Sequence, residues 1–337
     1  MPLAVHLARF GVGNLRREEL ASEPLGAGMV RVALDAVSLN RRDLLVVRGT
    51  YGPDLPLPLI PCSDGAGVIV EAGRDCGGLA PGDRVCTHMV PDWLDGPLQP
   101  QMRLTTLGAP AQGVLCEERV LPKGAVVPIP DSLPFEHAAC LPVAGLAAWN
   151  ALTAHAQIGR GSRVLLSGAG GLSMMGLGIA KALGADVAIT SSSDQKLAQA
   201  AALGADLTVN YRTAGWAERV REWSRGGVDI ALDIGGAATL DQSVRAVRDG
   251  GLVALLGVGA QGGPSPDLAQ ILTRRIRLHG IFVGSRAELE RYVAFVAAQA
   301  IAPVIDRVFD GLGSARHAFA HLLAGRHLGK IVIRVAR

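Results

Sequence analysis

Residues 164–173 read Val-Leu-Leu-Ser-Gly-Ala-Gly-Gly-Leu-Ser, and an alanine-rich stretch and a second apolar run follow them. The pattern predicts a buried strand at Arg163–Ser167, a helix at Leu172–Leu183 and a second strand at Val187–Thr190. A strand, a glycine turn, a helix and a strand in this order are typical of a βαβ unit that binds a dinucleotide. This stretch therefore predicts a nicotinamide-dependent oxidoreductase.

Two glycines of this stretch carry the physical argument. Gly168 allows the chain to turn sharply off the strand, and Gly170 allows bare backbone to approach a pyrophosphate. The N–H groups at the start of the next helix, at Gly171 and Leu172, then face the phosphate charge. Ser173 stands where the fingerprint has its third glycine, so the prediction rests on the flanking strands and helix as well as on the motif.

The end of the second strand predicts the choice of cofactor. Units that bind NAD usually carry an acidic residue there for the ribose hydroxyls, whereas this chain has Ser191, Ser192 and Ser193, followed by Lys196. Hydroxyl donors and an ammonium favour a 2′-phosphate, which a carboxylate would repel. We therefore expect NADP(H). Ser193 and Asp194 are also suited to cap the next helix, and both interpretations hold together because a cap needs only one serine.

Composition limits the function classes. The chain has 337 residues, of which 49% are hydrophobic and 19% charged, enough for two domains with ordinary cores. Its net charge of +3 is spread without basic blocks, so neither a nucleic-acid nor a membrane partner is expected. The sequence shows no N-terminal signal and no apolar run of ~20 residues, which predicts a cytoplasmic protein. The five cysteines are scattered, and we expect reduced, inert thiols.

Strand and helix patterns divide the chain. Short strand-like runs broken by Pro and Gly predict an irregular β-barrel in the first part, at Met29–Leu39, Ala66–Ala72, Arg84–His88 and Val114–Leu121. Six further strands alternate with helices and predict a doubly wound parallel sheet: Arg163–Ser167, Val187–Thr190, Leu207–Val209, Asp229–Asp233, Leu252–Leu256 and Arg277–Val283. We expect domains at 1–130 and 131–286, and a tail at 287–337 that returns to the first domain.

Motifs spread over nearly the whole chain resemble the medium-chain dehydrogenase/reductase superfamily, in particular its zinc-free quinone oxidoreductase and zinc-type alcohol dehydrogenase-like branch. They include Asn40-x-x-Asp43, Arg48-Gly49-x-Tyr51, Pro81-Gly82-Asp83-Arg84-Val85, Gly168-Ala-Gly-Gly171, Asp233-Ile-Gly-Gly236 and Gly329-Lys330. The resemblance implies an α/β protein with a six-stranded Rossmann sheet and a GroES-like β-barrel catalytic domain. It also implies a homodimer.

Some members of this superfamily bind a catalytic zinc ion and others do not. A catalytic zinc site needs three ligands of Cys, His or carboxylate type and one open position. The metal-bearing members place a Cys where this chain has Asn40, a His where it has Ser63, and a Cys or carboxylate near Val143. These three residue types do not make such a site, and we expect no metal. Cys62, beside the lost histidine position, is interpreted as a packed thiol.

Without a Lewis acid, oxidation of a simple alcohol lacks a fixed group to stabilise the alkoxide. Conjugate reduction needs only hydrogen-bond donors for the charge that develops on a carbonyl oxygen. By resemblance, Asn40 and Tyr51 face the nicotinamide and could supply them. Alternatively, Asn40 bonds backbone at a strand end and Tyr51 is a loop aromatic. We expect Asp43 to be a helix cap or a turn residue and not a catalytic acid.

The resemblance also assigns cofactor contacts. Arg41 and Lys330 are expected near the pyrophosphate, with a solvated Lys330 as the alternative, and Arg42 is either solvated or placed to meet an anionic substrate arm. The remaining contacts are expected from Gly168, Gly170, Gly171, Leu172, Ser191, Ser192, Lys196, Tyr211, Gly235, Gly257, Val258, Phe282 and Val283.

Three functions stay open at this point. The first is an NADPH-dependent reductase of an enone, an enal or a quinone. The second is an NADP-dependent dehydrogenase of an unusual alcohol. The third is a non-catalytic protein that binds NADPH as a sensor or as a partner, because fold alone does not decide function.

Overall fold

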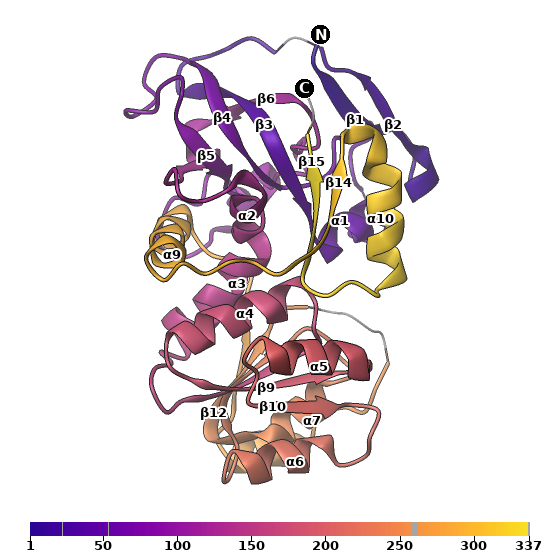
Figure 1. Cartoon of the computed structure of the whole chain (residues 1–337), viewed down its shortest axis with the longest axis vertical. Coiled ribbons are helices and arrows are strands. Elements are labelled where there is room, and N and C mark those ends of the chain that lie inside the picture. The colour runs from indigo at the N-terminus through magenta and orange to yellow at the C-terminus, as the bar shows by residue number, and fades with distance from the viewer. Residues whose placement is uncertain (22, 53, 258–261, 336–337) are drawn as a thin grey trace. The chain divides into compact units, whose positions relative to one another are not determined.

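A computed structural model describes residues 1–21, 23–52, 54–257 and 262–335. The chain divides into two compact units, each with its own core (Figure 1). Unit 1 comprises Met1–Leu146 and Ser285–Arg337, and unit 2 comprises Ala147–Gly284. Unit 1 is therefore built from both ends of the chain, and unit 2 from one continuous segment. The protein has an α/β fold, with a parallel Rossmann sheet in unit 2 and a separate mixed sheet in unit 1.

Unit 2 contains six parallel strands. They are β8 (Arg163–Ser167), β9 (Asp186–Ser191), β10 (Leu207–Asn210), β11 (Val228–Asp233), β12 (Val247–Leu255) and β13 (Arg277–Gly280). Their order across the sheet is β10-β9-β8-β11-β12-β13. The order reverses between β8 and β11, and a dinucleotide binds outside the carboxyl ends of the strands at such a point.

Helices connect the strands of unit 2. They are α3 (Leu146–Asn150), which begins at the last residue of unit 1, α4 (Gly171–Ala182), α5 (Asp194–Ala202), α6 (Trp216–Trp223), α7 (Leu240–Ala246) and α8 (Leu268–Thr273). The core between sheet and helices is aliphatic, with Trp216 as its one large aromatic among the described, fully buried members. The predicted strand at 277–283 ends at Gly280, because Val283 has a positive φ and leaves the extended conformation.

Unit 1 contains a mixed sheet in the order β14-β15-β3-β4-β5-β7, and β6 also pairs with β3. The strands are β3 (Met29–Leu39), β4 (Asp64–Ala72), β5 (Arg84–Thr87), β6 (Glu118–Pro122), β7 (Val126–Pro128), β14 (Ile305–Asp310) and β15 (Lys330–Arg334), with a separate hairpin of β1 (Leu3–Leu7) and β2 (Leu15–Glu19). The predicted strand at 114–121 is shorter, because Val114 and Leu115 donate to the loop carbonyls of Cys62 and Pro61 instead.

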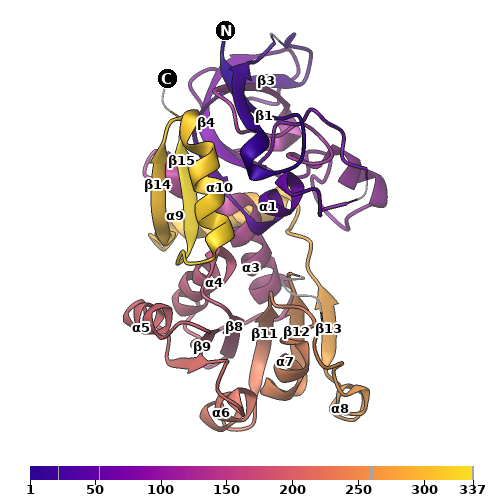
Figure 2. The same ribbon diagram turned by 90° about the vertical axis from the view of Figure 1, so that its right-hand side faces the viewer.

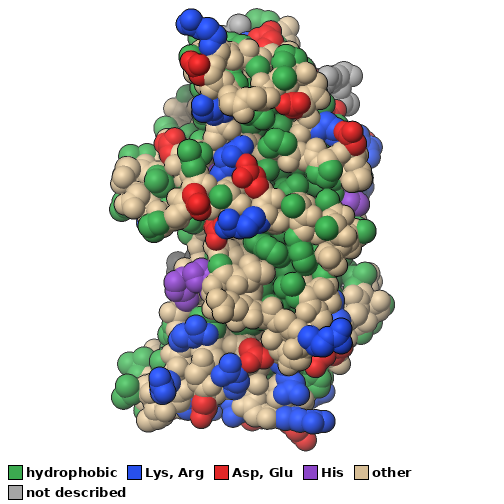
Figure 3. Space-filling view, turned by 90° about the vertical axis from the view of Figure 1, so that its left-hand side faces the viewer, with side chains coloured by type: hydrophobic (Ala, Val, Ile, Leu, Met, Phe, Trp, Pro, Cys, Tyr) green, Lys and Arg blue, Asp and Glu red, His purple; other side chains and the backbone are tan. Residues whose placement is uncertain are grey.

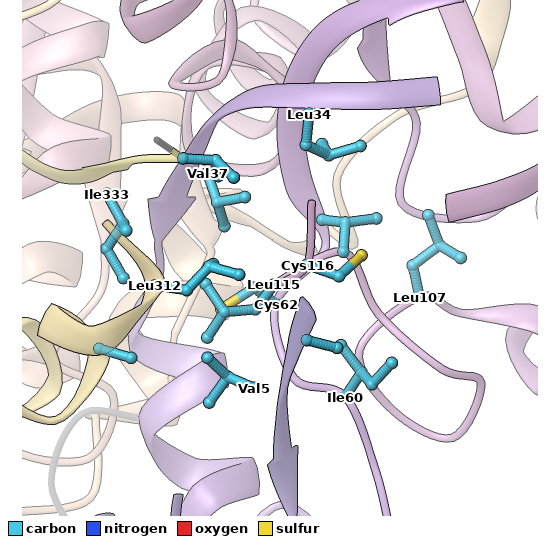
Figure 4. Close-up of a cluster of buried hydrophobic side chains, with 14 of the residues drawn as sticks. Val5, Leu34, Val37, Ile60, Cys62, Leu107, Leu115, Cys116, Leu312 and Ile333 are labelled. Atoms are coloured by element: carbon cyan, nitrogen blue, oxygen red, sulfur yellow. The ribbon is translucent and has the colours of Figure 1, made fainter. Parts of the chain in front are cut away.

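The helices of unit 1 are α1 (Arg41–Val47), α2 (Phe135–Ala138), α9 (Arg286–Ala298) and α10 (Ala315–Ala324). The core gathers residues that are far apart in the sequence: Figure 4 shows Val5 and Ile60 together with Leu312 and Ile333 of the tail. The tail is held by backbone pairing as well, since Ile331 of β15 lies opposite Leu39 of β3 in an antiparallel register.

The border between the units lies at Leu146 and Ala147, not at residue 131. Residues 131–146 belong to unit 1 because α2 packs against β3 and β4, and the helical turn at Leu141–Gly145 packs against β4 and β5. The tail segment of unit 1 begins at Ser285, which is the N-cap of α9.

Charged side chains of both signs occur together over the face shown in Figure 3. No helix among the described residues is long and apolar enough to cross a membrane.

Candidate functional site

The glycine turn of unit 2 is open at the start of α4. Gly168 has a φ of 78°, which strains any residue with a Cβ. Gly170 is the N-cap of α4, and a Cβ built there would meet no atom within 4 Å. The first N–H groups of α4, at Gly171 and Leu172, therefore have both free space and the positive end of the helix dipole, as an anion requires.

A polar atom lies beside this turn without a partner. The hydroxyl of Ser167 is buried at the carboxyl end of β8, and its Oγ has no hydrogen bond within the described chain. A buried polar atom without a hydrogen bond costs free energy, unless a ligand or a water molecule supplies the partner. Together with the open turn, it is consistent with a bound dinucleotide phosphate.

The serine in place of the third glycine has a structural reason. Ser173 is buried, and its hydroxyl donates to the carbonyl of Ser167 at 2.8 Å, which ties α4 to the strand before it. The close packing that the third glycine normally allows occurs one turn later, at Gly176, where a Cβ would lie 3.1 Å from Leu166. The sequence analysis missed Gly176, although its spacing from Ser173 along the helix was a usable signal.

The serines lie at the end of β9, where the sequence analysis placed the end of this strand. Ser191 is buried and its Oγ accepts from the N–H of Ser193, while Ser193 itself caps α5 by accepting from the N–H of Lys196. Asp194 is the nearest acid, and its carboxylate accepts from the side chain of Asn210. Lys196 is half-buried and Tyr211, which follows β10, is exposed. No acidic residue therefore takes the position that NAD-binding units use.

The turn after β11 is fixed from inside the unit. The buried carboxylate of Asp233 accepts from the N–H groups of Gly235 and Gly236 and from the hydroxyls of Thr239 and Ser243. The N–H of Gly235 is thus already used within the unit and is not available to a cofactor.

The segment after β12 approaches the turn after β11 closely, and the segment after β13 makes a strained turn of its own. A Cβ at Gly257 would lie 2.8 Å from the carbonyl of Ile234. Val258 lies outside the described residues. Val283 has a φ of 53°, which is strained for a β-branched residue, and its carbonyl accepts from the side chain of Asn150 at 2.8 Å. Phe282 beside it is partly exposed. Asn150, which the sequence analysis did not single out, holds this strained turn.

In unit 1, Asn40 lies where β3 ends and α1 begins. The N–H of Asn40 donates to the carboxylate of Asp43 at 2.7 Å, so Asp43 closes the first turn of α1 as expected. Burial raises the pKa of Asp43 to about 6, although the Arg42 guanidinium counteracts part of this effect. Asp43 is fully buried, so it is a helix-capping residue with no access to a substrate.

Lys330 is buried beside Asn40, with only 2% of its surface exposed. Its Nζ donates to Asn40 Oδ1 at 2.6 Å and to the carbonyl of Leu39 at 2.9 Å, and it lies 3.8 Å from Asp64 Oδ2. An ammonium held in this way has no surface to offer a pyrophosphate, nor is it solvated. Its position indicates instead that Lys330 orients the carboxamide of Asn40, because the ammonium can bond only the oxygen of that amide.

Asp64 is the acidic partner of this cluster. It accepts from the hydroxyl of Ser63 at 2.8 Å and from the N–H of Val143 at 3.3 Å. Burial raises the pKa of Asp64, and the Lys330 ammonium is the strongest influence in the opposite direction. The amide of Asn40 also favours the Asp64 anion. Its Nδ2 carries two hydrogens and forms no full hydrogen bond in the described chain, which leaves donor capacity for a ligand.

Tyr51 lies partly buried next to Arg42. The Arg42 Nε donates to the Tyr51 hydroxyl at 3.5 Å, and the guanidinium lies 5.0 Å from the ring centre. Arg42 also donates to the carbonyls of Leu107 and Ala109, so it fixes loops and is not solvated. Because the Tyr51 oxygen accepts from Arg42, its own proton is left to donate elsewhere. Arg41, the first residue of α1, is exposed.

These residues do not fit a catalytic zinc ion. The three positions that metal-bearing members use come together here, but they hold a carboxamide, a hydroxyl and an aliphatic side chain, at Asn40, Ser63 and Val143. The Lys330 ammonium at 2.6 Å from Asn40 Oδ1 already supplies a positive charge there, and it would repel a metal cation. In the described part of the chain, no three His, Cys, Asp or Glu side chains group so as to hold a metal.

Cys62 is a member of the hydrophobic core of unit 1, where Figure 4 shows it beside Leu115. Burial raises the pKa of its thiol. A thiol that stays protonated is a poor metal ligand and a poor nucleophile, which agrees with its interpretation as a packed side chain.

Family models of known proteins match both parts of the chain. Residues 26–131 match the alcohol dehydrogenase GroES-like domain, and residues 171–298 match the zinc-binding dehydrogenase domain. A zinc-type alcohol dehydrogenase-like protein of Schizosaccharomyces pombe is 38% identical over 98% of this chain and 98% of its own length. The chain belongs to the medium-chain dehydrogenase/reductase superfamily.

Solved structures of the superfamily show the same fold. An NAD-dependent alcohol dehydrogenase is 31% identical with a TM-score of 0.90, covering 99% of this chain and 100% of its own. A quinone oxidoreductase of Pseudomonas syringae pv. Tomato DC3000 is 26% identical with a TM-score of 0.83, over the same shares of the two chains. Membership establishes an oxidoreductase family that uses a nicotinamide cofactor. The two structures differ in the reactions that their names give, so likeness alone leaves the reaction of this chain undecided.

Proposed function

We propose that the protein is an NADPH-dependent, zinc-independent reductase of an activated C=C bond or of a quinone. The observation that carries the proposal is a pair of donors in unit 1, the Asn40 amide and the Tyr51 hydroxyl, each of which keeps a hydrogen for a ligand, beside a cluster whose residues do not fit zinc. Two such donors suit the oxygen of a conjugated carbonyl, which needs hydrogen bonds more than a Lewis acid.

The cofactor part of the proposal rests on unit 2. The residues that would hold the pyrophosphate are Gly168, Gly170 and the first N–H groups of α4, together with the unpartnered Ser167 hydroxyl. Ser191, Ser192 and Lys196 would hold the 2′-phosphate of the adenosine ribose, with Tyr211 beside it. When bound, the cofactor supplies a hydride to the substrate.

The residues of unit 1 have separate parts in this proposal. Asn40 and Tyr51 donate hydrogen bonds to the carbonyl oxygen of the substrate, and these bonds strengthen as negative charge develops there. Lys330 is a positioning residue: it holds Asn40 Oδ1 and so directs Nδ2 toward the substrate. The bond from Lys330 also polarises the amide and strengthens it as a donor.

We further propose that the protein acts in the cytoplasm as a homodimer. The strand β13 supports the second statement, since it ends the sheet of unit 2 with its outer edge unpaired among the described residues, and Leu278 on it is exposed. An exposed edge strand is a ready template for pairing with a second copy. Light scattering measures the state directly, and a monomer at micromolar concentration would contradict this proposal.

A panel of acceptors tests the reaction. Purified protein with NADPH should lose absorbance at the nicotinamide band when a quinone, an enone or an enal is added. The second candidate, dehydrogenation of an alcohol, is favoured by the named activity of the 31% identical structure, and it predicts an absorbance gain with NADP⁺ and an alcohol. Tight NADPH binding without hydride loss to any acceptor would favour the non-catalytic protein and would overturn both enzyme proposals.

A further inference from the structure

A hollow of about 440 Å³ lies on unit 1 between β14 and α10. Figure 2 shows β14, β15 and α10 grouped together in unit 1. The hollow is lined by Arg307, Phe309, His317, Ala320, His321, Ala324 and Arg326. On the helix these are positions three and four apart, which share one face. The hollow exists because two of the helix positions that face it are alanines.

The lining of this hollow is positively charged. Within the described chain, Arg307 and Arg326 form no ion pair with a carboxylate, and the Arg307 guanidinium lies 4.7 Å from the ring centre of Phe309. The acids of β14 are committed elsewhere. Asp306 accepts from His321 Nε2 at 2.7 Å, and Asp310 accepts from Arg334 at 2.7 Å. Two permanent cations therefore share the hollow without a free counter-charge.

Helix termination explains only part of this arrangement. Basic side chains near the last turn of a helix stabilise its carbonyl end, and α10 ends at Gly325. That effect accounts for His321 and Arg326. It does not account for Arg307, which is on the strand β14.

We propose that this hollow binds a small molecule that carries a phosphate monoester on an apolar or aromatic group. Guanidinium groups pair with phosphate oxygens through two parallel hydrogen bonds, and two guanidiniums match the double charge of the ester. The apolar side chains of Phe309, Ala320 and Ala324, which line the hollow, suit the organic part. The volume is within the range of small-molecule sites. The proposal goes beyond the proposed reductase activity, in which none of these residues takes part.

Phenyl phosphate is the probe. Inorganic phosphate and phenol, which correspond to its two parts, are the control ligands. The ring signals of His317 and His321 in NMR spectra localise binding to the hollow, and calorimetry gives the affinity. We expect phenyl phosphate to shift both signals and to bind at least tenfold more tightly than inorganic phosphate, and phenol to cause no shift. The double variant Arg307→Gln with Arg326→Gln should weaken binding of phenyl phosphate at least tenfold.

A matched control separates a built site from general charge attraction. The double variant Arg9→Gln with Arg291→Gln removes the same charge from exposed positions of unit 1 outside the hollow, and it should bind like the parent. Ala320→Glu places a negative charge on the exposed helix face and should abolish the shifts without unfolding. Equal weakening in both arginine pairs would overturn the proposal. So would binding of phosphatidic acid vesicles through Arg307 and Arg326 with no response to phenyl phosphate, since a lipid surface would then be the ligand.

Discussion

The two units assemble their functional groups in opposite ways. In unit 2 the glycine turn is made by consecutive residues, from Ser167 to Ser173, and its glycines can be recognised in the sequence. In unit 1 the polar cluster joins Asn40 and Lys330, which are 290 positions apart, with Asp64 and the backbone of Val143. A local motif carries its geometry in its own backbone, whereas a cluster of distant residues depends on how the strands pair.

The two units also differ in how far their ion pairs are exposed to solvent. The ion pair of Lys181 and Asp206 in unit 2 is short, at 2.8 Å, but about a third of each side chain is exposed. The pair of Lys330 and Asp64 in unit 1 is longer, at 3.8 Å, and almost completely buried. Burial decides which pair contributes more to stability, because solvent screens the charges of the first pair and does not reach those of the second.

The largest expected effect follows from that contrast. Lys330→Met leaves the Asp64 carboxylate buried without its cation, and loss of one partner of a buried pair costs about 3–5 kcal/mol. We expect a large drop in the denaturant midpoint of unit 1. The control is Lys181→Met in unit 2, for which about 0–1 kcal/mol is expected. Similar losses in the two variants would show that the comparison between the units is wrong.

The second prediction concerns the binding of the cofactor by unit 2. Lys196→Ala removes a charge-assisted bond to the 2′-phosphate, which should weaken NADPH by about 1.5–3 kcal/mol and leave NADH almost unchanged. Fluorescence titration with both cofactors gives the two constants. Equal affinities of the parent protein for NADPH and NADH would remove the basis for this assignment.

The third prediction concerns the donors of unit 1. Tyr51→Phe keeps the ring and removes the hydroxyl, so NADPH affinity should stay constant while kcat for an enone or a quinone falls about tenfold to a hundredfold. The effect lies at the low end of donor deletions, because water can replace a partly exposed group. Asn40→Ala should lower kcat in parallel. If neither variant changes kcat for any accepted substrate, these two residues are not the donors.

The smallest expected effect is that of a metal chelator. Because the residues at the metal positions do not fit zinc and Lys330 supplies a cation there, dialysis against a chelator should change neither the unfolding midpoint nor turnover. Elemental analysis should find far less than one zinc per chain. One tightly held zinc per chain would show that the residues of this cluster do bind a metal ion.

The predicted elements of unit 2 were close to the observed ones because hydrophobic runs and glycine turns are local signals. The strand at Arg163–Ser167 has the predicted bounds, and Ser193 caps α5 as expected. The turn at Gly235 was harder to predict from the sequence. Four groups of the following segment donate to Asp233, and no sequence pattern indicates which carboxylate will accept these hydrogen bonds.

The sequence by itself determined the fold class, the superfamily resemblance and the residues of the glycine turn, because periodicity and turn chemistry act over a few neighbouring positions. It also identified Asn40, Tyr51 and Lys330 as special, but it assigned Lys330 to a pyrophosphate or to solvent. Only the tertiary structure decided that this ammonium is buried against Asn40 and Asp64. The reason is physical: the partner of a buried charge is set by which strands lie side by side, and β15 reaches β3 from the other end of the chain.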